Sequence, residues 1–177
     1  MGPTPVSLIP LLLAGLLAGC AVTPDGGPRG HLRLLQPLDI PPEAASLRLQ
    51  YGRVVARNAV QEHDPFCIFE IDTRKEVAQG VAPGRFAITR VIRSVETFAG
   101  LPVMPLRPMR VAFHDDGSPT LLYFKTTFIL TDAAQPVRSL ACMSNQMAPG
   151  NPIQRHLSLA EIRQALGGLF SLELPGT

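Results

Sequence analysis

Proline and glycine constrain this chain more than any other feature of its sequence. The 177 residues include 18 prolines and 15 glycines. Proline interrupts helices and central strands because it lacks an N–H group, and glycine supplies the backbone angles of tight turns. Apolar residues make up 46% of the chain and charged residues 17%, which is enough apolar material for a buried core. We therefore expect a mainly β fold of short antiparallel strands, arranged as a β-sandwich or a small barrel.

Alternating and β-branched segments predict where these strands lie. Leu47 and Leu49 alternate with polar residues, as in a half-buried strand, and the turn signal Pro83-Gly84 precedes a long β-branched segment. The predicted strands are 46–56, 66–72, 86–98, 109–114, 120–131 and 137–143. The segment Asp115–Pro119 has the composition of a hairpin turn between two of them. No gap between the strands shows a crossover helix, so antiparallel order is favoured.

One short helix is expected near the C-terminus. Ser158 and Glu161 have the spacing of a capping box, and Gly167-Gly168 marks the end of the helix. The apolar face of this helix would be formed by Leu159, Ile162, Leu166 and Leu169. The last apolar segment, 169–174, can return as an edge strand.

The N-terminus has the pattern of an export signal. Val6–Gly19 is an uncharged apolar stretch that stops at Cys20. It is shorter than the roughly 20 residues that cross a bilayer, and it fits the apolar region of a signal peptide. Met1–Ser7 departs from that pattern because it contains no Lys or Arg. The alternative is a cytoplasmic protein with an apolar N-terminal helix and an ordinary buried cysteine.

Leu17-Ala18-Gly19-Cys20 resembles the lipobox of bacterial lipoproteins. The resemblance implies cleavage before Cys20, a diacylglyceryl group on its sulfur, and acyl chains such as palmitate. Ala21 follows in place of the Asp that favours retention in the inner membrane, so we expect the periplasmic face of the outer membrane. The expected organisation is a signal peptide over 1–19, a lipidated N-terminus and Pro/Gly-rich tether over 20–31, and a single β-rich domain over 32–177.

Two cysteines remain, and an exported protein meets an oxidising compartment. Cys67 alternates with Phe69 and Ile71, and Cys142 shares a side with Leu140, so both sulfurs are expected in the interior. A redox-active pair, a catalytic cysteine and metal ligands are alternatives, although no CxxC is present. We predict a structural Cys67–Cys142 disulfide with Cα atoms about 4.4 to 6.8 Å apart.

Motifs with catalytic or metal-binding chemistry are scarce. His114-Asp115-Asp116 and Glu62-His63-Asp64 contain metal-ligand types, but turn and loop chemistry explains both, so we assign no metal. GxSxG, HExxH, a Gly-rich phosphate loop and SxxK are all missing, so no catalytic residue and no cofactor is assigned. An enzyme would need His63 or His114 in a cleft beside a carboxylate from a distant strand.

Charge gives no sign of a nucleic-acid partner. The formal net charge is +2, and the arginines are scattered from Arg29 to Arg163. Nucleic-acid binding proteins gather their cations into a patch, often with aromatic residues between them. This footprint is missing, so we expect no nucleic acid among the partners.

Several segments of the mature chain resemble a group of outer-membrane lipoproteins of Gram-negative bacteria whose function is uncharacterised. The segments are Ile40-Pro41-Pro42, Gln50–Arg53, Asp64–Glu70, Val81–Phe86 and Leu140-Ala141-Cys142. The resemblance implies an envelope lipoprotein with paired cysteines in FC and LxC contexts. It implies no activity and no catalytic residue.

The anchor, the β-rich domain and the missing motifs together favour a non-enzymatic protein-interaction or structural module at the outer membrane, with a protein partner in the envelope. The competing hypothesis is a small-ligand or lipid carrier with a pocket in the β-domain. A carrier needs roughly 300 Å³ or more of apolar cavity, whereas an interaction module can be packed solid.

Overall fold

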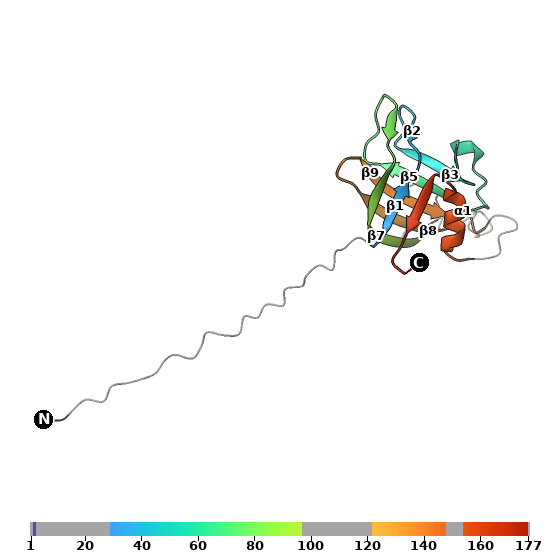
Figure 1. Ribbon diagram of the computed structural model, residues 1–177. Helices are drawn as coiled ribbons and strands as arrows, with labels where there is room; N and C mark the ends of the chain where they lie inside the picture. Colours follow the sequence, from blue (N-terminus) through green and yellow to red (C-terminus); the bar gives the residue numbers. More distant parts are fainter. Residues whose placement is uncertain (1, 3–28, 97–121, 148–153, 177) are drawn as a thin grey trace.

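The computed structural model describes residues 29–96, 122–147 and 154–176, together with Gly2. The chain forms a curled antiparallel sheet, a half-barrel, with one short helix near the C-terminus (Figure 1). This confirms the predicted mainly β class, and a single curled sheet is closer to the small barrel than to the sandwich.

In the described residues, eight strands build the main sheet in the order β10-β1-β7-β8-β9-β5-β3-β4, and β2 pairs with β6 in a separate two-stranded sheet. The strands are β1 His31–Leu34, β2 Leu38–Ile40, β3 Ser46–Gln50, β4 Arg53–Val55, β5 Phe66–Ile71, β6 Gln79–Val81, β7 Gly84–Glu96, β8 Tyr123–Thr131, β9 Val137–Met143 and β10 Phe170–Glu173. The helices are the 3-10 turn η1 Arg57–Ala59 and the α-helix α1 Leu159–Leu166. Every pairing in both sheets is antiparallel, as expected.

The segment 46–56, predicted as one strand, is a hairpin. Tyr51 and Gly52 separate β3 from β4, with φ of 52° and 75°. Positive φ at both central residues is typical of the two-residue turns that match the twist of a hairpin. The prediction of one continuous strand was therefore wrong, because the alternation of apolar residues continues to Tyr51, the first residue of the turn.

The concave face of the half-barrel holds the main hydrophobic core. Cys67, Phe69 and Ile71 of β5 all lie in it, as their alternation predicted. Phe69 stands at its centre, with ring centroids 6.4 Å from Phe86 and 5.2 Å from Phe170. Leu38, Ile40 and Val81 of the β2–β6 pair belong to the same cluster, so the small sheet caps the core of the large one.

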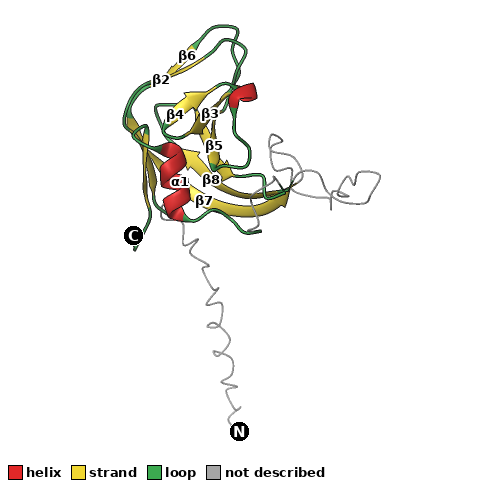
Figure 2. Cartoon of the chain, turned by 90° about the vertical axis from the view of Figure 1, so that its right-hand side faces the viewer, coloured by secondary structure: helices red, strands yellow, loops and turns green. Residues whose placement is uncertain are grey.

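Helix α1 covers the concave face between the two ends of the sheet (Figure 2). Its capping box is present: Ser158 accepts a hydrogen bond from the Glu161 amide, and Glu161 accepts one from the Ser158 amide. Ile162, Ala165 and Leu166 are buried in the main core. The Gly52 amide donates to the Ala165 carbonyl at 3.0 Å, so the β3–β4 turn is fixed to the end of the helix. The predicted C-terminal helix and returning edge strand are both confirmed.

The opposite face of the sheet carries a second, smaller cluster. Its buried members are Phe66, Ile68, Tyr123, Ala141 and Met143, and Val60 packs against them. The central strands β5 and β9 are therefore apolar on both faces, which explains their nearly continuous burial.

Part of the predicted hairpin lies outside the described residues. Its first arm, 109–114, and its turn, 115–119, are not among them, and the described neighbours of β8 are β7 and β9. Strand β1 begins at His31, the last residue assigned to the tether. Within the described part of the chain, no helix has the length and apolar character needed to cross a membrane.

Candidate functional site

The predicted cysteine pair is brought together. Cys67 and Cys142 are directly opposite each other on β5 and β9, and their sulfurs lie at a disulfide distance of 2.13 Å. Their Cα atoms are 4.1 Å apart, slightly below the predicted window. The reason is that they are partners on adjacent strands, whose Cα atoms approach to about 4.5 Å in the closer type of antiparallel pair. Both residues are fully buried, as expected of a structural bridge.

The Glu62-His63-Asp64 loop is held by two tyrosines. The Tyr123 hydroxyl donates to Glu62 at 2.7 Å, and the Tyr51 hydroxyl donates to Asp64. His63 lies on the surface with Nε2 at 3.5 Å from Asp64, its neighbour in sequence. Each of these two carboxylates therefore accepts a hydrogen bond from a tyrosine hydroxyl.

Burial and these hydrogen bonds disfavour ionisation of both phenols. Desolvation, followed by the hydrogen bond to Glu62, raises the pKa of Tyr123 well above its usual value. The hydrogen bond to Asp64 is the largest cause of the raised pKa of Tyr51. Both hydroxyls act as hydrogen-bond donors to these carboxylates. The loop serves to cover the outer cluster through Val60, and Gln50 fixes it by exchanging two hydrogen bonds with the Gln61 backbone.

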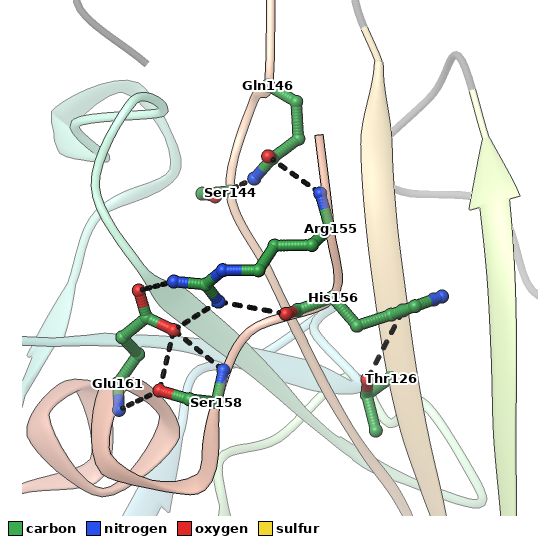
Figure 3. A network of polar contacts seen from close by, with 7 residues as sticks. All are labelled: Thr126, Ser144, Gln146, Arg155, His156, Ser158 and Glu161. Carbon is green, nitrogen blue, oxygen red and sulfur yellow. Dashed lines mark hydrogen bonds and ion pairs between the residues drawn. The ribbon is translucent and has the colours of Figure 1, made fainter. Parts of the chain in front are cut away.

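A polar network joins the end of β9 to the start of α1 (Figure 3). Arg155 donates two bonds to the Glu161 carboxylate, at 2.7 and 2.8 Å. The same carboxylate accepts from the Ser158 amide and hydroxyl. At the other end, Gln146 accepts from the Arg155 amide at 3.3 Å and donates to Ser144 at 2.6 Å. This network fixes the segment that leads into the helix.

The pKa of Glu161 reflects this position. The hydrogen bond from Arg155 is the largest cause, and together with the bonds from Ser158 it lowers the pKa of Glu161 to about 2. A carboxyl with so low a pKa is ionised at neutral pH, so it is poorly suited to donate a proton. The pair therefore has the character of a structural bidentate ion pair.

His156 lies beside this network, at the end of the concave face. Its Nδ1 is 3.5 Å from the Thr126 hydroxyl, and its ring meets Phe124 edge-on at 5.5 Å. Desolvation first, and the nearby charge of Arg93 second, lower the pKa of His156. Both effects disfavour the charged imidazolium form. Within the described residues it has no carboxylate partner that would make it a general base.

A buried ion pair lies on the outer face of β7 and β8. Lys125 Nζ is 3.1 Å from Glu96, and the two side chains are 6% and 22% exposed. Ser94 donates to the other Glu96 oxygen at 2.7 Å. The carboxylate thus neutralises a buried ammonium group, which is the condition under which such a charge is tolerated.

The sequence did not indicate one surface feature of β7. β8 pairs with β7 as far as Glu96, but β1 pairs only with Gly84–Ala87 on the other side, and the backbone bonds from Arg29 and Gly30 end at Ile88. Within the described chain, no strand pairs with β7 beyond that point. We call Arg90–Glu96 the open edge. No sequence pattern could have indicated it, because it depends on where the neighbouring strand β1 ends.

Several predicted residues lie outside the described ranges, namely Cys20, Ala21 and His114-Asp115-Asp116. Among the residues that are described, no group of three or more His, Cys, Asp or Glu side chains is placed to hold a metal ion. Comparison with known protein families, with curated proteins and with solved structures gave no match for this chain.

Proposed function

We propose that this protein is an exported lipoprotein, held by acyl chains on Cys20 at the periplasmic face of the outer membrane. Its β-domain acts without catalysis, by presenting a surface to a protein partner. The lipobox-like segment that ends at Cys20 supports the anchor, and two or three acyl chains hold a protein stably where one does not. Ala21 supports the outer membrane over the inner one.

The observation that carries the interaction role is the filling of the concave face. A single cluster of buried apolar side chains extends from β1 to β10 and includes α1 and the β2–β6 pair. A carrier would use this face to enclose its ligand in an apolar cavity. In the described residues, Phe69, Phe86, Phe128 and Phe170 occupy it instead, so recognition falls to the outer surface and the strand edges.

Purification of the lipidated protein from native membranes tests this proposal. Crosslinked proteins and organic-soluble small molecules are identified separately from the same preparation. We expect a specific protein crosslinked to the β-domain, and its loss in Cys20→Ser, which is no longer held at the membrane. A small molecule bound at one per chain, with no protein partner, would establish a carrier and contradict the proposal.

A further inference from the structure

We propose that the open edge of β7, Arg90–Glu96, binds an extended segment of the partner protein by strand addition, and that this segment alternates acidic and apolar residues. The inference rests on the proposed function and deepens it, because it names the binding surface and the chemistry of the partner. An unpaired strand edge presents a row of N–H and C=O groups to which another chain can hydrogen bond. Seven residues offer roughly 23 Å of such an edge.

A β-bulge decides which side chains the edge presents. The register between β7 and β8 shifts between Ile88 and Arg90, which leaves Thr89 as an extra residue. Strand residues alternate in direction, so the bulge places Val91, Arg93 and Val95 on the concave side, opposite Phe128, Thr126 and Phe124. Without the bulge, Arg90 and Ile92 would take that side.

The apolar side chains of the edge are exposed. Val91 is 38% exposed and Val95 is 53% exposed, although both lie on the side that carries the core further along the strand. In Figure 2, β7 and β8 run side by side along the lower margin of the molecule, away from the small β2–β6 sheet. A partner strand would place two apolar side chains beside these valines and remove them from water.

The positive charge of the open edge indicates that the partner segment carries acidic residues. Arg90 and Arg93 are exposed, and neither makes an ion pair within the described residues. Glu96, the only carboxylate of the edge, already binds Lys125 and Ser94. Among the described residues, the edge therefore presents two arginines that make no ion pair, one on each face. A partner strand would match them with carboxylates at the opposed positions.

A second copy of this chain fits the edge less well. Two antiparallel copies of Arg90–Glu96 would have to satisfy four arginines with two Glu96 carboxylates, both of which are already engaged. A register centred on Arg93 would also oppose two guanidinium groups, which is unfavourable. We therefore assign the edge to a different protein.

Charges and bulges also protect edge strands from unwanted pairing. A very short strand is another such protection, as on the edge strand β4, which has three residues. The open edge is more than twice as long and keeps two exposed valines on either side of one arginine. This combination suits selective pairing, because the valines favour association and the arginines exclude strands that lack acidic residues.

Two peptides test the proposal on the disulfide-bonded mature domain. The capped heptapeptide TVTEVVE, aligned antiparallel, places its glutamates opposite Arg93 and Arg90 and valines opposite Val95, Ile92 and Val91. In TVTKVVK both glutamates are replaced by lysine. We expect TVTEVVE to slow exchange of the amides of residues 90–96 that point away from β8. We also expect it to bind about tenfold more tightly than TVTKVVK, with the difference shrinking as salt is added.

Charge-reversed variants separate the edge from general electrostatics. Arg90→Glu with Arg93→Glu should invert the preference between the two peptides. The control, Arg33→Glu with Arg138→Glu, changes the net charge equally at exposed positions of β1 and β9 and should leave the preference unchanged. If the first variant fails to fold, Arg90→Gln with Arg93→Gln replaces it and should abolish the preference. Equal binding of both peptides to the wild type would overturn the proposal.

Two further outcomes would also contradict the proposal that the open edge binds a different protein. Residues 90–96 pair with β8 on one side, so only their amides that point away from β8 report on the open edge. Slow exchange of those amides in the free monomer would mean that the edge is already paired within the chain. A dimer in sedimentation that disappears in the charge-reversed variant would assign the edge to a second copy.

Photocrosslinking in the lipidated full chain distinguishes this inference from the proposed function. A photoreactive residue replaces either Ile92 on the open edge or Val77, which is exposed in the loop between β5 and β6. Capture of an envelope protein from position 92, and not from position 77, supports both the proposed function and strand addition at the open edge. Capture from position 77 alone would leave the proposed function standing and contradict the inference that the partner binds at the open edge. Capture from neither position, together with a bound small molecule, would overturn both.

Discussion

At the scale of single residues, Gly52 and Gly167 face each other where the β3–β4 turn meets the end of α1. Gly167 has a φ of 53°, and a Cβ placed there would clash with the Cα of Gly52. Gly167→Ala should therefore lower the free energy of unfolding by about 2 kcal/mol or more, from backbone strain and overpacking together. Urea unfolding measures the loss. Gly168→Ala is the control, because a Cβ there meets no atom within 4 Å.

Glu161 gives a prediction about acid stability. Its pKa is lowered from 4.5 to about 2, chiefly by Arg155, so the ionised carboxylate stabilises the fold fully above about pH 4.5. That contribution is lost as the pH falls towards 2, where the folded state also takes up the proton. Glu161→Gln keeps a side chain that can complete the capping box but removes the charge. Urea midpoints measured from pH 6 to pH 2 should fall less steeply for this variant.

An exposed glutamate provides the control for that experiment. Glu76 lies in the loop between β5 and β6 and makes no ion pair within the described residues. Glu76→Gln should follow the wild-type curve. If Glu161→Gln also follows it, the Arg155–Glu161 pair does not stabilise the fold.

At the scale of elements, the disulfide is the strongest link between distant segments. It joins β5 to β9 across a sequence separation of 75, in the centre of the sheet. Cys67→Ser or Cys142→Ser should reduce stability by about 2 to 5 kcal/mol. Thiol titration of the unfolded, unreduced mature protein should find no free thiol from this pair. Two thiols per chain at full stability would show that the cysteines are only buried apolar residues.

The length of the alternating sequence pattern in each strand decided whether that strand could be predicted. The alternation around Cys67 and Cys142 continues over several residues, so β5 and β9 were found together with the faces of their cysteines. β1, β2 and β6 have three or four residues, too few to establish a period, and they were missed. Sequence patterns also indicate which face of a strand is buried, but they do not indicate which other strands lie beside it. The open edge of β7 was unpredictable because it depends on where β1 stops.

At the scale of the whole molecule, the anchor gives the simplest prediction. Cys20→Ser should yield a protein that no longer incorporates labelled fatty acid and is no longer retained in the membrane fraction, because the thioether-linked lipid has no other attachment point. Metabolic labelling followed by fractionation measures both effects. Cys67→Ser provides the control and should still be labelled. Labelling that survives Cys20→Ser would contradict the assignment of the signal peptide.

The pairing of β1 with β10 has a consequence for how the chain matures. The first strand of the domain, His31–Leu34, lies between β7 and the last strand, Phe170–Glu173, and the helix that covers the core comes just before that strand. The sheet therefore cannot be completed until β10 has left the ribosome. Contacts between residues this distant in sequence form slowly, so the completion of the sheet is a late step in folding. Such a delay would suit the export that we propose, because an exported polypeptide crosses the membrane before it folds.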